Sequence, residues 1–365
     1  MSWPGAPTAL LEQEGLAFRP LDAVLGEEGT AAADAAARTW ARVWGRLPLA
    51  DGKSFRELVE WRGASLLWSA TAFLLEETAG PRCARTAERA LQLLEATGAV
   101  EVDAVGLEAS DALLLSRACT VRGVLFHGRV ASPGRPLPVA RKAARSGLGR
   151  FLAGALLPGT PPPLPDPAAG AGLDGPPVLA LVEPGRDDLL LLLEGVSASL
   201  GQPVVAVSLD ELPRWETRRA RRAIGEAEAL LRGCHRALVG TPGLAASCAH
   251  RGVGFADLAG SDLEALALGA LVAAARRIEA ARELLAAARP SAVLLAVGGR
   301  DERRSLVHAA SSVGLGVVAL RGRGDADRAD GGPQPASACE WEPGQGAGVV
   351  ADALGEAARG RVEAG

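Results

Sequence analysis

The sequence predicts an α/β fold: two Rossmann-like parallel-sheet lobes with flanking helices, joined by a basic linker rich in proline and glycine. Two observations support the α/β class. Helical periodicity alternates with short runs that are apolar on both faces, as strands buried inside a parallel sheet are. The clearest such runs are Val178–Val182, Pro203–Val207, Ala292–Val297 and Gly316–Leu320. A third observation, the change of composition between residues 131 and 176, predicts the division into two lobes.

The composition is that of a globular protein. The chain has 365 residues, 48% apolar and 22% charged, which is enough for two domains with cores of their own. The net charge of −4 argues against a general nucleic-acid-binding protein, because such proteins usually carry a basic excess. Only two of the 39 basic residues are lysine, a bias that we attribute to GC-rich codons, so the arginine content does not indicate phosphate binding.

Cysteine usage and the N-terminus predict a cytoplasmic protein. Peripheral contact with the inner face of the membrane is compatible with this location. The five cysteines lack CxxC spacing and are interpreted as reduced, mostly buried thiols rather than metal ligands. Residues 1–4 lack the charged-then-apolar order of a signal peptide. No apolar run approaches the roughly 20 residues that span a bilayer.

Residues 1–130 are predicted to form the first lobe, opened by helices. An alanine-rich helix carries Trp40 and Trp44 four residues apart, which favours packing of one face. A second helix is expected to begin at Ser54, capped by that serine with Glu57, and to carry Leu58, Trp61, Ser65 and Trp68 on one side. The expected elements that follow are helix Ala84–Ala96, strand Val100–Leu107, helix Asp111–Ala118 and strand Gly123–Phe126.

Residues 131–176 are predicted to be the linker. No acidic residue occurs from Ala112 to Pro165, and residues 139–157 have the pattern of a basic amphipathic helix. Such a helix can lie on an anionic membrane surface. The alternative, a linker helix packed on a neighbouring lobe, is favoured because three glycines weaken the helix. Pro158–Pro177 is expected to be a semi-rigid connector.

Residues 177–323 are predicted to form the second lobe. Its first strand leads through a glycine turn into a helix that ends near Leu200, and a charged helix is expected from Pro213 to Arg232. A capping box, Ser261 with Glu264, predicts the start of a long helix. The Arg289-Pro290 step should end it, because proline disfavours helical geometry in the preceding residue. Residues 324–365 are expected to be a polar tail with one short helix.

An internal repeat relates the two predicted lobes. Leu94 aligns with Leu285 at an offset of 191 (285 − 94), and residues 52–58 align with 252–258 at an offset of 200 (252 − 52). So long a period is not that of a solenoid repeat. It predicts two related α/β units, although a common strand-helix-strand pattern would produce part of the match.

Two glycine turns are the candidate ligand contacts. Gly185-Arg186 and Gly298-Gly299-Arg300-Asp301 each follow a predicted strand and precede a helix, whose N-terminal N–H groups favour an anion. Ligands of open parallel sheets bind at this edge. The alternative is that glycine only shapes each turn, and N-capping explains Asp301 as well as a general base does. Neither turn matches the full GxGxxG or Walker spacing, so no cofactor is assigned.

His127 is the candidate for acid/base chemistry, because it follows the last strand of the first lobe and so lies at a carboxyl edge. The sequence contains no GxSxG or HExxH motif. No carboxylate lies at ligand spacing from a histidine, so we predict no metal site.

Residues 177–323 resemble a known family in several strands and in the turns that follow them. The residues that carry the resemblance are Val178–Val182, Leu209-Asp210-Glu211-Leu212, Ala288–Leu295, Gly316–Gly322 and, in the first lobe, Asp51–Trp68 and Phe126-His127-Gly128. Together they look like the acceptor-side, N-terminal half of GT-B glycosyltransferases of surface-polysaccharide biosynthesis.

The resemblance implies a glycosyltransferase-like protein that takes a nucleotide-sugar or glycan, with helix N-termini stabilising the diphosphate. Where the family has Gln-His, this chain has Leu320-Arg321, and only 42 residues (365 − 323) follow Arg323. The donor-binding half of the family is therefore expected to be absent. The alternative is a non-catalytic Rossmann-like binding or assembly protein, with a partner chain supplying a donor domain.

Overall fold

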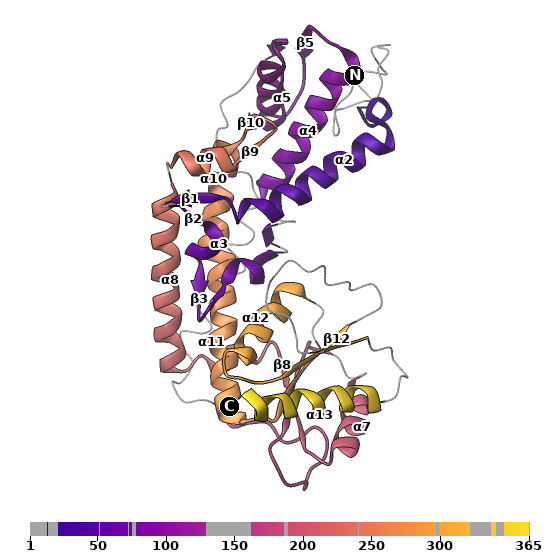
Figure 1. Cartoon of the computed structure of the whole chain (residues 1–365), viewed down its shortest axis with the longest axis vertical. Helices are drawn as coiled ribbons and strands as arrows, with labels where there is room; N and C mark the ends of the chain where they lie inside the picture. The colour runs from indigo at the N-terminus through magenta and orange to yellow at the C-terminus, as the bar shows by residue number, and fades with distance from the viewer. Residues whose placement is uncertain are drawn as a thin grey trace. The chain divides into compact units, whose positions relative to one another are not determined.

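The computed structural model is a mixed α/β structure with parallel sheets, which confirms the predicted class (Figure 1). It describes residues 13, 21–50, 52–71, 73–74, 78–128, 162–185, 189–239, 241–296, 299–321, 337–340 and 347–364. The chain divides into two compact units that interleave in sequence. Unit 1 comprises residues 1–55, 73–143 and 234–266, and unit 2 comprises 56–72, 144–233 and 267–365.

Unit 2 contains a five-stranded sheet in which every strand is parallel to its neighbours. The strands lie in the order β13-β12-β11-β7-β8. Read in chain order this is 2-1-3-4-5, so the direction of winding reverses between β7 and β11. The strands are β7 (Val178–Val182), β8 (Val204–Ser208), β11 (Ala292–Ala296), β12 (Val317–Arg321) and β13 (Ser337–Glu340).

Helices cover both faces of this sheet. One face packs its alternate residues, such as Ala180 and Leu294, against α7 (Leu190–Leu200) and α13 (Ala347–Ala364). Figure 1 shows α12 (Arg300–Ser311) on the opposite side of the strands from α13. The five residues of β11 are all buried, which explains why its sequence is apolar on both faces.

The strand β13 was not expected from the sequence. The tail 324–365 was predicted to be polar apart from one helix, but residues 337–340 pair in parallel with β12, Val318 opposite Ser337. Four residues that include a serine and a glutamate show no clear strand periodicity, so this pairing depends on the neighbouring strand. The predicted terminal helix is present as α13.

Unit 1 is mainly helical. Its core includes Trp40 and Trp44 on α2 (Leu21–Trp44), and both indole N–H groups donate to Ser247, to its carbonyl at 3.0 Å and to its hydroxyl at 3.1 Å. A short parallel pair, β5 (Glu101–Ala104) and β6 (Leu125–Gly128), flanks α5 (Ala109–Arg122). The remaining elements are β1 (Pro48–Ala50), β2 (Lys53–Ser54), α4 (Ala79–Thr97), α9 (Pro242–Ser247), β9 (Ala249–His250), β10 (Val253–Gly254) and α10 (Ala256–Ala265).

The prediction of one helix from Ser54 that includes Trp68 is wrong. Arg62 and Gly63 have φ values of 55° and 81°, which form a tight two-residue turn and break the helix. We call residues 56–71 the docking strap, because they leave the first-lobe sequence and belong to unit 2. The segment instead forms α3 (Phe55–Leu58), β3 (Glu60–Trp61), β4 (Ala64–Ser65) and the 3-10 helix η1 (Leu66–Ala70).

The helical start predicted at Ser261 is also wrong. α10 begins at Ala256, and the side chain of Asp262 accepts a hydrogen bond from the backbone N–H of Ala79. A π-helical turn, η5 (Leu266–Ala270), precedes α11 (Leu271–Ala288). The predicted stop is confirmed, because α11 ends immediately before Arg289. The charged helix α8 (Arg218–Leu238) follows the 3-10 turn η4 (Leu212–Trp215) rather than beginning at Pro213.

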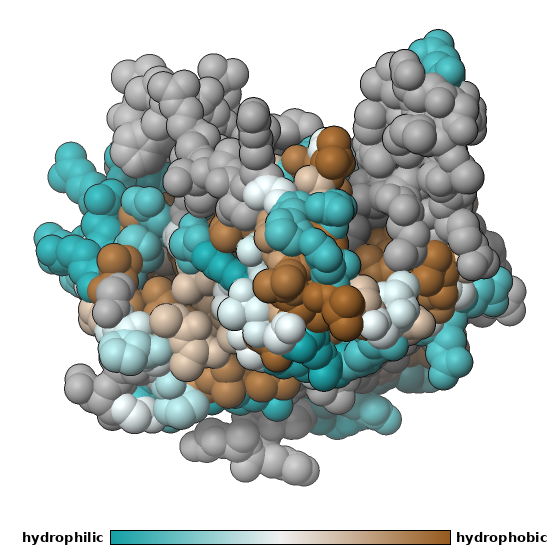
Figure 2. Space-filling model, turned by 90° about the horizontal axis from the view of Figure 1, so that it is seen from above, coloured by the Kyte–Doolittle hydropathy of each residue, from teal (hydrophilic) through white to brown (hydrophobic). Residues whose placement is uncertain are grey.

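Within the described ranges, one helical run, Ala256–Ala288, is long and apolar enough to cross a bilayer. The protein buries 59% of its most apolar window, as it would bury a core helix. Figure 2 shows hydrophobic patches among hydrophilic residues on the face seen from above.

Candidate functional site

The point at which the strand order reverses in unit 2 brings two predicted turns to one edge. β7 and β11 are neighbours in parallel register, with Val182 opposite Ala296, and the N–H of Glu183 donates to the Ala296 carbonyl at 3.3 Å. Gly185 and Gly299 therefore follow adjacent strand ends. This is the position at which open α/β sheets bind ligands.

The N-terminus of α12 points toward this edge but already faces a carboxylate of its own helix. Gly299 is the N-cap residue, and an added Cβ there would lie 2.1 Å from the Glu302 carboxylate. Glu302 also accepts a hydrogen bond from Arg277 Nη1 at 3.0 Å. A glutamate at this third helical position can satisfy unpaired N–H groups of the first turn, so Glu302 occupies the place that an anionic ligand would take.

The structure places the other predicted site residues as follows. Gly185 is exposed with a φ of 76°, and Asp301 is buried in the first turn of α12. Arg300 is the first residue of that helix. Arg186 and Gly298 lie outside the described residues, as does the segment 139–157 predicted to contact a membrane.

His127 belongs to unit 1, whereas the glycine turns belong to unit 2. It lies on β6 with its side chain 53% exposed, and its Nε2 is 2.6 Å from Glu101 Oε1 on the neighbouring strand. Both side chains of this cross-strand contact are more than half exposed, so solvent reaches much of the His127 ring.

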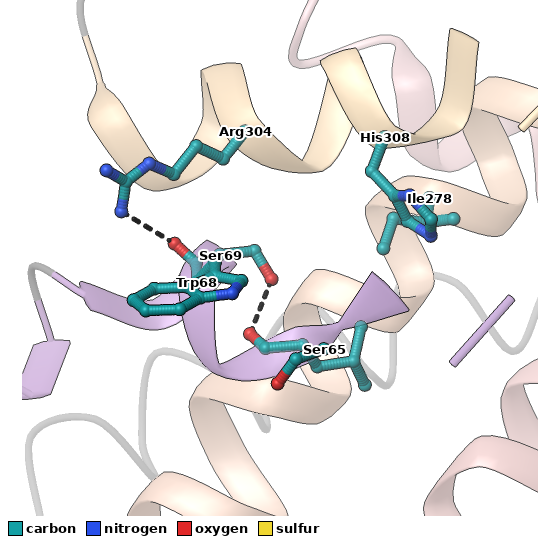
Figure 3. Close-up of a pocket in the computed structure, with 7 residues that line it drawn as sticks. Ser65, Trp68, Ser69, Ile278, Arg304 and His308 are labelled. Carbon is teal, nitrogen blue, oxygen red and sulfur yellow. Dashed lines mark hydrogen bonds between the residues drawn. The ribbon is translucent and has the colours of Figure 1, made fainter. Parts of the chain in front are cut away.

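A second cluster, which the sequence did not suggest, lies where the docking strap meets α11 and α12 (Figure 3). Arg304 donates to the Trp68 carbonyl at 3.0 Å and to Thr71 Oγ1 at 2.7 Å. His308 Nε2 is 3.1 Å from the Trp61 carbonyl. A cavity of about 10 Å³, room for one water, is lined by Ser65, Leu66, Trp68, Ser69, Ile278, Arg304 and His308.

Glu279 of α11 holds the turn of the strap. Its Oε1 accepts hydrogen bonds from Trp61 Nε1 at 2.8 Å and from Arg62 Nε at 2.9 Å, and the glutamate is buried. Burial lowers the pKa of the nearby His308, so its ring is neutral at pH 7. The available sequence signal was Gly63, an isolated glycine that lowers the helix propensity of this segment.

Unit 1 contains a similar arrangement. The turn between β9 and β10 is Arg251-Gly252, with φ values of 47° and 88°. Glu88 of α4 lies 2.6 Å from His250 Nε2 and 3.0 Å from Arg251 Nη1. Both units therefore hold a tight hairpin through a glutamate of a long helix.

The described residues include no group of three or more His, Cys, Asp or Glu side chains that could hold a metal ion. Burial raises the pKa of Cys83 to about 12, so this thiol is not a nucleophile at neutral pH. Comparison with family models, with curated proteins and with solved structures found no match.

Proposed function

We propose that unit 2 is a Rossmann-like lobe that binds a nucleotide-sugar or glycan, in a glycosyltransferase-like protein of surface-carbohydrate biosynthesis. The observation that carries this proposal is the reversal of strand order between β7 and β11, with a glycine turn after each strand. Sheets of this order bind their ligands at such a reversal. The sequence resemblance to GT-B enzymes supplies the ligand class.

In this proposal the diphosphate lies at the N-terminus of α12, where the helix dipole and the Gly299 turn favour a negative charge. The carboxylate of Glu302 competes with the diphosphate for that position. Arg277, which donates a hydrogen bond to Glu302, would donate to the diphosphate when it is bound. Arg186 and Arg300 add positive charge from the two turns.

The test is calorimetric titration of the full chain with a panel of nucleotide-sugars, together with thermal-shift measurements. We expect binding heat and a raised Tm for at least one of them. Arg300→Ala should weaken the binding. Glu302→Gln should strengthen it about two- to fivefold, because a competing negative charge near a helix N-terminus is worth roughly 0.3–1 kcal/mol.

Arg218→Ala is the matched control, since Arg218 is an exposed arginine on α8 and should leave binding unchanged. An absence of both heat and thermal shift across the panel would refute the proposal. Equal weakening by Arg218→Ala and Arg300→Ala would indicate a general charge effect and would also count against it.

A second candidate is a non-catalytic binding or assembly protein that relies on a partner chain for the donor domain. The observation that favours it lies in unit 1, whose described residues form a parallel sheet of two strands rather than five. Transfer of sugar by the isolated chain would exclude this candidate. Restoration of transfer by a separate co-purifying chain would support it.

The lobe and linker organisation and a cytoplasmic location belong to the same proposal. In it, residues 1–130 form the first Rossmann-like lobe, residues 131–176 are the linker, and residues 139–157 contact anionic membrane only peripherally. Deleting residues 139–157 should then abolish any co-sedimentation with anionic liposomes.

A further inference from the structure

Three groups of polar contacts hold the docking strap on two helices of unit 2. Its turn donates to Glu279, its Trp61 carbonyl faces His308, and its η1 end accepts from Arg304. The partners of all three groups lie on α11 and α12. Two of the three partners, His308 and Arg304, come from a single face of α12, one helical turn apart (Figure 3).

Among these contacts His308 is the group whose ordinary pKa, about 6.5, lies nearest to neutral pH, and it is buried, with 8% of its surface exposed. The charged groups near it are Arg282 and Glu279 of α11 and Arg304 of its own helix, which lines the same cavity. Two of these three are cations. The carboxylate, Glu279, is already bonded to Trp61 and Arg62.

A proton added to His308 therefore enters a buried site with an excess of positive charge. The adjoining cavity has room for about one water, which is too little to hydrate an imidazolium ion. When the strap detaches, the ring becomes exposed and can be hydrated. Protonation and docking of the strap thus oppose each other.

We propose that His308 is an acid-sensitive latch for the docking strap: the neutral ring donates to the Trp61 carbonyl and holds the strap on α12, and protonation releases it. This inference does not depend on the proposed ligand.

The direction of the pH effect follows from linkage. Burial, which is the largest influence, lowers the pKa of His308 while the strap is docked, whereas the exposed ring has its usual value of about 6.5 once the strap has detached from α12. Docking is unaffected above that value. As the pH falls below about 6.5, His308 is protonated first in molecules whose strap has detached. The equilibrium constant for detachment of the strap therefore increases by up to about tenfold per pH unit, until His308 is protonated in the docked state as well.

The test is hydrogen–deuterium exchange of the full chain between pH 7.5 and 5, with rates corrected for intrinsic exchange. Peptides covering residues 56–71 should lose protection below about pH 6.5. In His308→Gln, whose amide can still donate to the Trp61 carbonyl, protection should not change with pH. His250→Gln is the matched control in unit 1 and should keep the wild-type profile.

A pH-independent profile in the wild-type chain, or a profile in His308→Gln as steep as that of the wild type, would overturn the proposal. Should His308→Gln fail to fold, the wild-type ring itself decides the matter by NMR titration. A His308 ring that titrates at or above its ordinary value, with the strap still protected, would contradict the latch.

Discussion

The hairpin of unit 2 and the hairpin of unit 1 are held in the same way by different donors. Each turn is an Arg-Gly pair with positive φ at both residues, and each arginine binds a helix glutamate. The other donor is the indole of Trp61 in unit 2 and the imidazole of His250 in unit 1. Glu88 and Glu279 are 191 residues apart (279 − 88), which is the offset of the predicted internal repeat.

The shared feature shows why an arginine stands in a conformation that usually selects asparagine or glycine. A left-handed non-glycine residue costs about 1 kcal/mol or more. A hydrogen-bonded ion pair with a mostly buried carboxylate can offset that cost. The backbone strain at Arg62 and Arg251 is thus tied to contacts far away in the sequence.

The largest effect is expected for the carboxylate of unit 2. Glu279→Ala should lower the free energy of unfolding by about 3 kcal/mol, because it leaves Trp61 Nε1 and Arg62 without their acceptor. Urea denaturation measures this loss. Glu283→Ala, on the same helix, is the matched control and should cost under about 0.5 kcal/mol, since its partner Arg219 is 3.9 Å away and has a side chain that is 86% exposed. If Glu279→Ala and Glu283→Ala lowered the free energy of unfolding equally, the contacts of Glu279 with the strap would not be what stabilises the protein there.

An intermediate effect, which depends on pH, is expected in unit 1. Burial alone would raise the pKa of Glu88, but hydrogen bonds from His250, Gln92 and Arg251 outweigh it and hold the pKa below 4.5. Its stabilisation is therefore present above pH 4.5 and is lost as the pH falls through the lowered value. Glu88→Gln should cost about 1–2 kcal/mol at pH 7 and progressively less in acid.

The measurement is the difference in unfolding free energy between wild type and Glu88→Gln from pH 7 to pH 3. A difference that stays constant over this range would show that the charge of Glu88 contributes nothing to holding the hairpin.

The smallest effect concerns the ends of the two long helices that carry these glutamates. Gly98 follows α4 and Arg289 follows α11 as the C-cap residue, and both are left-handed, at φ 57° and 46°. Arg289 is exposed, so Arg289→Gly should raise the unfolding free energy by about 0.5–1 kcal/mol. The reciprocal Gly98→Arg should cost about 1 kcal/mol. Thermal unfolding of both variants measures these two changes. A higher Tm for Gly98→Arg than for the wild type would contradict the prediction.

The strands that the sequence predicted best are those that are buried on both faces. β11 is apolar throughout and completely buried, and it begins at the predicted residue, Ala292, while the predicted last residue, Val297, lies outside the described residues. β5 alternates between exposed and partly buried residues and has one partner, β6, among the described elements. Its predicted range was twice as long as the strand, because Val105 and Leu107 continue the apolar pattern although Val105 is 93% exposed.

The candidate site was predictable in part. The turns at Gly185 and Gly299 could be recognised because glycine before a helix has a local sequence signal. That their strands are neighbours, and that the strand order reverses between them, is a property of the sheet and not of either segment. The cluster of His308, Arg304 and Glu279 could not be found at all, since its partners in the strap lie more than 200 residues away.

The sequence by itself determined the α/β class, the buried strands of unit 2 and the end of α11, because burial periodicity, glycine and proline act over a few residues. Only the tertiary structure decided the conformation of residues 54–68. Their apolar spacing fits a helix, yet the chain turns at Arg62 and Gly63 because Glu279, on a distant helix, accepts hydrogen bonds from that turn. The contact partner, rather than the local pattern, selects the conformation there.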